Sequence, residues 1–170
     1  MNAQMADPHI GMLSFQEGLH AGILDVRQSP KHPDMFLHVD EPVPGEHRMT
    51  YVRLTNDRQT VLAFVVCVLN GHVDGFPCLS VGYAVPENFR NQGYAKQLLN
   101  DVVQDQVYRA GRAGVSTLYV EAVVDVTNLP SQRVAETVLN VERENMTEEL
   151  SGRPAYRYTA HFDTATGIQE

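Results

Sequence analysis

The sequence predicts an α/β fold in which helices flank a mixed central β-sheet. Between residues 81 and 107 the spacing of apolar residues changes from every second position to steps of three and four, which indicates a strand followed by a helix. Earlier in the chain a polar turn joins two strand-like segments, and a further strand and helix come later. Because 170 residues can bury one sizeable core, we expect a single domain over residues 1–162 and a flexible tail over residues 163–170.

The amino-terminal third of the chain gives the weakest pattern. Residues 15–26 predict a short helix. The residues from there to position 47 contain four prolines and predict irregular loops with at most one turn of helix.

A β-meander is expected next. Residues 48–54 and 60–69 are strand-like and are joined by the polar residues 56–59, which predicts a hairpin. A third strand, residues 78–85, follows a glycine-containing loop at residues 70–76.

The cysteines and histidines give no sign of a reactive or metal site. Cys67 and Cys78 lie in strand-like segments, and we expect two reduced, buried thiols, with a disulfide between them as the alternative. Two His-x-Asp pairs, which start at His38 and His72, each offer two ligands, but no third ligand is spaced to complete a metal site.

The segment from Val81 to Ala95 predicts a strand that ends in an anion-binding turn. Residues 81–85 alternate as a half-buried strand does, and helical spacing begins at Ala95. Arg90 to Ala95 would then form the first turn of the helix, where free N–H groups and the helix dipole favour an anion. Gly93 would let the backbone approach a phosphate closely, although an ordinary tight corner also explains a glycine here.

Another strand and helix follow this turn. Glycines at 111 and 114 end the helix that follows the turn, and residues 115–124 predict a buried parallel strand. Asn128 is suited to cap the next helix, with Pro130 in its first turn. Its inward face is expected to carry Val134, Ala135, Val138 and Val141. Alternating apolar residues near 156–162 predict a last strand.

These segments resemble the GNAT superfamily of acyl-CoA-dependent N-acetyltransferases, most strongly over residues 60–140. The pyrophosphate-binding turn of that family reads Arg or Gln, two residues, Gly, one residue, then Gly or Ala. The corresponding residues here are Arg90, Asn91, Gln92, Gly93, Tyr94 and Ala95. Asn91 replaces a frequent glycine, and Pro86 comes one position early. Asn128 and Ser131 resemble the Asn-x-x-Ser subset of a second family segment.

The resemblance implies a GNAT-type α/β sandwich with a splayed pair of parallel strands, and acetyl-CoA as co-substrate. In that arrangement the pantetheine arm would pair with the backbone of Tyr83, Ala84 and Val85, and the pyrophosphate would bind at residues 90–95. Asn128 would hydrogen-bond the pantetheine; as a helix cap it has an equally good structural explanation.

The resemblance leaves the acid and base less well defined. Ala135 stands where many relatives have a tyrosine acid, so Ser131 is the candidate proton donor, with a purely structural role in the first helical turn as the alternative. Glu121, among apolar neighbours, is the candidate base by position. An outward-facing polar residue on a sheet edge is the alternative for Glu121, and a water chain would serve in its place.

Amino-acid composition limits the classes of molecule that the protein is expected to bind. The net charge of -8 argues against nucleic acid and favours cationic acceptors. The acidic residues Glu142, Glu144, Glu148 and Glu149 either wall an acceptor site or form a solvated face. No apolar run reaches the length of a membrane helix and residues 1–7 do not start a signal peptide, so we expect a cytoplasmic protein without membrane contact; a homodimer is compatible.

Three functions fit these observations. The expected one is an N-acetyltransferase that moves acetyl from acetyl-CoA to a primary amine of a small cationic molecule or a protein. The second is a non-catalytic acyl-CoA-binding sensor or interaction module, which the missing tyrosine and strand carboxylate favour. The third, an aminoacyl-tRNA-acetylating toxin, is disfavoured by the acidic composition.

Overall fold

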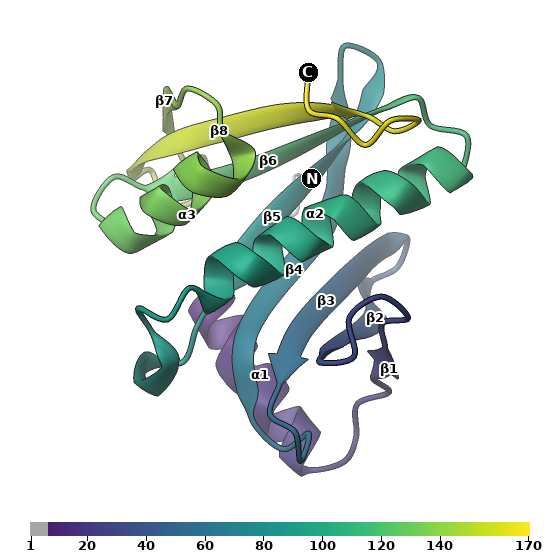
Figure 1. The fold of residues 1–170 in the computed structure, drawn as a ribbon. Coiled ribbons are helices and arrows are strands. Elements are labelled where there is room, and N and C mark those ends of the chain that lie inside the picture. The colour runs from purple at the N-terminus through teal and green to yellow at the C-terminus, as the bar shows by residue number, and fades with distance from the viewer. Residues whose placement is uncertain (1–6) are drawn as a thin grey trace. The chain divides into compact units, whose positions relative to one another are not determined.

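The computed structural model describes residues 7–170 (Figure 1). In chain order the elements are α1 Pro8–His20, β1 Arg27–Gln28, β2 Met35–Val43, β3 Glu46–Leu54, β4 Val61–Val73, β5 Phe76–Ala84, the 3-10 turn Glu87–Phe89, α2 Tyr94–Arg112, β6 Thr117–Asp125, α3 Leu129–Leu139, β7 Glu144–Thr147 and β8 Pro154–Asp163. The start of the expected domain and the expectation about a signal peptide fall on residues 1–6, which lie outside the described part.

The strands form a mixed sheet in the order β1-β2-β3-β4-β5-β6-β8-β7. β5 and β6 pair in parallel, and the other recorded ladders are antiparallel, which confirms an α/β fold with a mixed sheet. The described residues divide into two compact units. The first contains residues 7–68 and Gly82–Leu99, and the second contains Leu69–Val81 and Asn100–Glu170. That they act as one domain stays a prediction.

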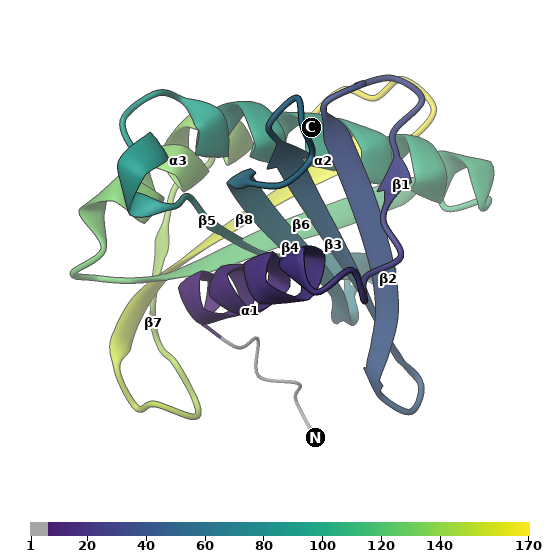
Figure 2. The same ribbon diagram turned by 90° about the horizontal axis from the view of Figure 1, so that it is seen from below.

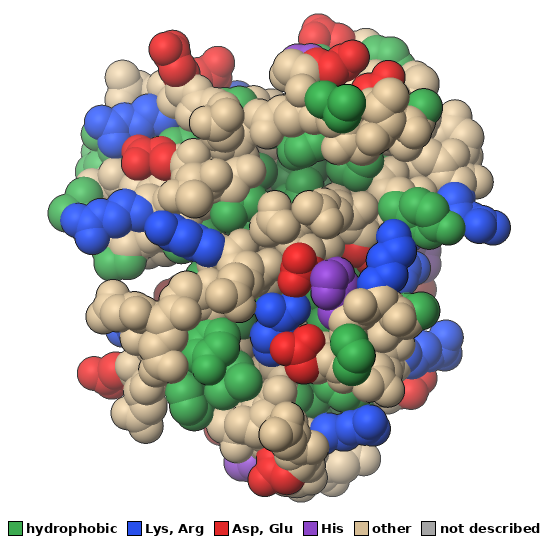
Figure 3. Space-filling view, viewed as in Figure 1, with side chains coloured by type: hydrophobic (Ala, Val, Ile, Leu, Met, Phe, Trp, Pro, Cys, Tyr) green, Lys and Arg blue, Asp and Glu red, His purple; other side chains and the backbone are tan. Residues whose placement is uncertain are grey.

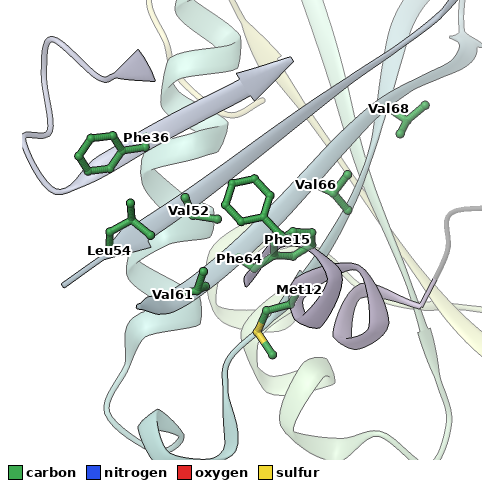
Figure 4. Packing of buried hydrophobic residues seen from close by; sticks show 9 residues of the cluster. All are labelled: Met12, Phe15, Phe36, Val52, Leu54, Val61, Phe64, Val66 and Val68. Carbon is green, nitrogen blue, oxygen red and sulfur yellow. The ribbon is translucent and has the colours of Figure 1, made fainter. Parts of the chain in front are cut away.

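In the first unit, α1 packs on one face of the strands β2, β3 and β4 (Figure 2). Met12 and Phe15 of α1 meet Val52, Phe64 and Val66 of the sheet, and all five side chains are buried (Figure 4). The Phe15 and Phe64 rings meet edge to face with 6.1 Å between centroids. This cluster holds α1 against the sheet.

The predicted helix over residues 15–26 is wrong at both ends, because α1 spans Pro8–His20. Asp7 caps its start by accepting a hydrogen bond from the His9 N–H at 3.0 Å, and Pro8 occupies the first turn. Gly22 takes a φ of 67° just after the helix, a conformation suited to glycine. The helix therefore begins at the Asp7-Pro8 start signal and not where the apolar spacing that led to the prediction begins.

The irregular loops predicted before residue 47 are also wrong, because they contain β1 and the nine-residue strand β2. β2 pairs with β3 along most of its length, with Leu37 opposite Tyr51. Its proline, Pro42, lies where the register shifts between Asp40 and Val43, so it removes no regular ladder bond. The prolines therefore mark a bulge and turns around a strand.

The predicted meander is confirmed, with β3, β4 and β5 close to the expected positions. The loop predicted at residues 70–76 is shorter than expected. β4 runs to Val73, β5 starts at Phe76, and only Asp74 and Gly75 connect them. Both have positive φ, 50° and 83°, as a two-residue hairpin turn requires. The predicted buried thiols, Cys67 and Cys78, are confirmed.

In the second unit, α3 packs against β6 and β8 (Figure 1). Burial alternates along β6, with Leu118, Val120, Ala122 and Val124 buried. The inward face of α3 carries Gln132, Ala135 and Leu139, so Ala135 is buried as predicted while Val134 and Val138 are only half-buried and Val141 follows the helix.

The carboxyl-terminal residues, for which fraying was expected, fold back on β8. Phe162 bridges to Gln169, and the Glu170 N–H donates to the His161 carbonyl at 3.0 Å. The side-chain amide of Gln169 also donates to the Leu139 carbonyl at the end of α3. The predicted last strand is confirmed as β8, and the short strand β7 pairs with it where only an acidic segment was expected.

Candidate functional site

The turn between β5 and α2 has an unusual backbone. The chain leaves β5 through the 3-10 turn, and Asn91 and Gly93 then take positive φ values of 62° and 82°. Because these conformations are not helical, α2 begins at Tyr94, and the residues from Arg90 to Gly93 precede the helix. This corrects the expectation that Arg90 to Ala95 forms its first turn.

The backbone N–H groups of this turn point to an anion site. The Gln97 N–H bonds the Gly93 carbonyl at 3.1 Å, which starts the helical ladder, and the Arg90 N–H bonds the Glu87 carbonyl. In the described part of the chain, no acceptor is recorded for the N–H groups of Asn91 to Lys96. N–H groups without an acceptor at the amino end of a 19-residue helix have the geometry that favours phosphate oxygens, so this turn is the candidate anion site.

Arg90 and Gly93 fit such a site for different reasons. The Arg90 Nε donates to the Val85 carbonyl at 3.1 Å, so the exposed arginine is anchored to the end of the strand beside the turn. A Cβ built on Gly93 would meet only the Gln97 Nε2, at 3.7 Å. The space above Gly93 is therefore open, and its positive φ is the local reason for a glycine.

β5, which leads into the turn, has a short ladder with β6. The recorded pairs join Cys78 with Tyr119, Leu79 with Val120 and Ser80 with Glu121. β5 then continues to Ala84, with Tyr83 buried and Ala84 half-buried.

Asn128 and Ser131 belong to the second unit. Asn128 Oδ1 accepts the Ser131 N–H at 3.2 Å, so Asn128 caps α3 as predicted. Gln132, which the sequence did not single out, is buried and its Nε2 donates to the Asp125 and Val126 carbonyls at 3.1 and 3.0 Å. These two bonds hold the end of β6 against the start of α3. The Asn-x-x-Ser pattern directly before Gln132 is the sequence feature that could have drawn attention to it.

The end of β6 is further stabilised by Asp125. Its Oδ1 accepts the Thr127 hydroxyl at 2.6 Å and the Thr127 N–H at 2.8 Å, and Arg153 lies 2.9 Å from Oδ2. The hydrogen bonds from Thr127 hold the pKa of Asp125 below its usual value, with Arg153 acting in the same direction.

Glu121 is half-buried on β6, and its Oε1 accepts a hydrogen bond from the Asn70 Nδ2 at 2.7 Å. Asn70 comes from the end of β4, 51 positions earlier, so no local pattern indicated this pair. Near it, burial raises the pKa of the Cys78 thiol to about 12, and the charge of Glu121 adds to the effect. Cys78 is therefore a neutral thiol.

Ala135 is fully buried, so its position offers no proton donor to a ligand. A tyrosine from another element does contact α3. Tyr158 of β8 is fully buried, and its hydroxyl donates to Glu136 Oε1 at 3.2 Å. Burial raises the pKa of this tyrosine. Arg143 stacks over Tyr156 with 4.0 Å to the ring centroid and lies 3.7 Å from Glu136.

The acidic segment before β8 is largely exposed, and one member has a structural role: Glu148 Oε2 accepts the Ser151 N–H at 2.9 Å. On the face shown in Figure 3, basic side chains lie among acidic ones. Across residues 7–170, no three or more His, Cys, Asp or Glu side chains gather as a metal site would need. None of the helices in that range has the length and apolarity of a membrane crossing.

The model of the acetyltransferase (GNAT) family matches residues 18–140, which is more than half of the chain. The chain belongs to this family. The family consists of acetyltransferases and uses acetyl-CoA. Membership of the Asn-x-x-Ser subset stays a prediction. A search of curated proteins gave no match.

Solved GNAT structures share the fold. The ribosomal-protein-S5-alanine acetyltransferase from Vibrio fischeri is 15% identical, with a TM-score of 0.53 over 66% of this chain and 60% of its own. A spermidine N-acetyltransferase SpeG chimera from Vibrio cholerae and hSSAT is 14% identical, with a TM-score of 0.50 over 70% and 68%.

A structure of the NatC complex bound to Gag peptide and CoA contains a chain that is 14% identical, with a TM-score of 0.50 over 94% of both chains. At these identities the likeness concerns the fold alone, and it confirms the GNAT-type α/β architecture. The chain spans less than two thirds of some matched structures, such as 64% of a GNAT acetyltransferase from Bacillus anthracis.

Proposed function

We propose that this chain transfers the acetyl group of acetyl-CoA to a primary amine of a small cationic molecule or a protein. The observation that carries the proposal is the run of N–H groups from Asn91 to Lys96, which have no recorded acceptor in the described chain. Such a run binds a pyrophosphate without any special side chain. Acetyl-CoA supplies an acetyl group already activated as a thioester.

The residues assigned to acetyl-CoA fit it chemically. The turn from Arg90 to Ala95 would bind the pyrophosphate, with Gly93 leaving room for its oxygens. The backbone of Tyr83, Ala84 and Val85 would pair with the pantetheine amides as an added strand does. Asn128 keeps a side-chain N–H for the pantetheine while its oxygen caps α3.

Two side chains are proposed to move protons. Glu121 would accept the proton that an ammonium group must lose before it attacks, and Ser131 would donate to the departing thiolate. Positioning supplies most of the remaining rate, because amine and thioester react readily once they are aligned. Ala135, buried and without a donor, is the reason for assigning the acid to Ser131.

A cationic acceptor is supported by charge. The net charge is -8, and three glutamates in and around β7 are exposed: Glu142, Glu144 and Glu149. Opposite charge raises the local concentration of a cationic substrate. Two of the matched structures are, by name, enzymes for spermidine and for a ribosomal protein, which are amine acceptors of the two proposed kinds.

Release of free thiol from acetyl-CoA tests the proposal across a panel of polyamines, basic peptides and neutral amines. We expect turnover with at least one cationic amine and weaker turnover with the neutral amines. The acetylated product should gain the mass of one acetyl group. Binding of CoA without thiol release for any amine would contradict the proposal and favour a binding module.

A further inference from the structure

In the second unit, β6 presents two chemically different faces. Tyr158 of β8 reaches α3 through its bond to Glu136, and Ala122 is its partner on β6, so Ala122 and the other buried residues of β6 face the helix. Glu121 alternates with them and therefore lies on the opposite face. Its neighbours across the ladders are Ser80 of β5 and Thr159 of β8, which places the carboxylate in the middle of a polar face.

The bond from Asn70 to Glu121 spans a strand. β4 and β6 are not neighbours in the sheet, because β5 lies between them. The Asn70 Nδ2 nevertheless reaches Glu121 Oε1 at 2.7 Å. The amide thus holds one carboxylate oxygen, and no donor among the described residues is recorded for the other, Oε2.

An amide is well suited to hold a base. It donates a hydrogen bond without carrying a charge or a titrating proton, so it orients the carboxylate without competing for the proton that the base must accept. A lysine or arginine in the same place would instead neutralise the carboxylate as an ion pair.

We propose that Asn70 is a positioning residue, which holds the Glu121 carboxylate so that Oε2 takes the proton of the attacking amine. This inference rests on the proposed function, in which Glu121 is the base. The hydrogen bond recorded for the Asn70 side chain goes to Glu121, so we expect Asn70 to act through this carboxylate. Because Asn70 is exposed, its substitution leaves the buried packing intact.

A double-mutant cycle on thiol release tests this role with Asn70→Leu, Glu121→Gln and the combined variant. We expect Asn70→Leu to lower kcat by about tenfold while KM for acetyl-CoA stays within about twofold, since only alignment of the base is lost. In the Glu121→Gln background the same change should have less than about a twofold effect, because the base has already gone. Asn70→Gln keeps an amide donor and should recover part of the rate.

Asn100→Leu is the matched control. It makes the same change at an exposed position of α2 with no recorded bond to Glu121, and should leave kcat unchanged. A purely structural role for Asn70 would lower Tm and reduce kcat equally in both backgrounds, which overturns the proposal. Full activity of Asn70→Leu also overturns it while the proposed function stands. Full activity of Glu121→Gln overturns both this inference and the assignment of Glu121 as the base, while acetyl transfer itself stands. Absence of thiol release by the wild-type protein overturns the proposed function itself, and this inference with it.

Discussion

Substitution of Gly93 tests the proposed anion-binding turn most directly, because its effects on stability and on binding can be separated. Gly93 has a φ of 82°, and a Cβ there would meet only the Gln97 Nε2 at 3.7 Å. Gly93→Ala therefore creates no clash, and its cost is the backbone strain of a left-handed residue, about 1–2 kcal/mol. For a chain of this size, each kcal/mol lowers Tm by about 2–4 °C.

The effect on CoA should be larger than the effect on stability. An added methyl group would occupy the open space through which phosphate oxygens approach the N–H groups, so we expect Gly93→Ala to weaken CoA binding about tenfold. Gly93→Glu adds a carboxylate where the pyrophosphate should bind. Bulk and like charge together should raise the Kd of CoA by at least about 100-fold, or about 2.7 kcal/mol.

Gly45→Ala is the matched control for this experiment. Gly45 has a φ of 85° in the turn between β2 and β3, with nothing within 4 Å of a built Cβ. Its substitution by alanine therefore imposes the same backbone strain without altering the turn that contains Gly93. Calorimetric titration with CoA and thermal melts should show similar losses of Tm for both alanine variants, with binding lost only at position 93. A folded Gly93→Glu protein with wild-type affinity would refute phosphate binding at this turn.

Three further predictions concern the ligand, the acid and the pH dependence. CoA at 100 times its Kd should stabilise the fold by about 2.7 kcal/mol, seen as a higher Tm, and no shift at saturation would contradict CoA binding. Ser131→Ala should lower kcat at least about tenfold with little change in CoA affinity, whereas a lower Tm with normal turnover would indicate a structural serine. Thr127→Val removes a donor that lowers the pKa of Asp125, so it should reduce Tm near neutral pH. That loss should disappear as acid protonates Asp125 in the folded state; a constant loss would argue against the linkage.

Local signals in the sequence predicted the parts of the site that depend on backbone conformation. The Asn128 cap depends on two residues that are three positions apart. The Asn128 side chain accepts the Ser131 N–H, so the pattern can be recognised in the sequence. Gly93 likewise has a local reason, its positive φ. The exact start of α2 was missed because Asn91 also takes a positive φ, which few non-glycine residues do.

Predictions failed where tertiary pairing overrode local preference. Residues 27–47 contain four prolines, yet β2 forms because β3 offers a ladder and a bulge accepts Pro42. The tail at residues 163–170 is short and mostly polar, so fraying was expected. The Gln169 side chain nevertheless donates a hydrogen bond to the Leu139 carbonyl at the end of α3, 30 positions away. No window of local sequence contains the partner of Gln169.

The same limit applies to the candidate chemistry and explains why Asn70 was overlooked. A phosphate-binding turn is built from consecutive residues, so its spacing can be read along the chain. A general base also depends on the group that orients it, and for the proposed base, Glu121, that group comes from a strand two places away in the sheet. Sequence patterns can thus predict where a co-substrate would bind and still leave the proton-transfer groups open. The double-mutant cycle on Asn70 and Glu121 is informative for this reason, because it measures the long-range coupling that the sequence does not display.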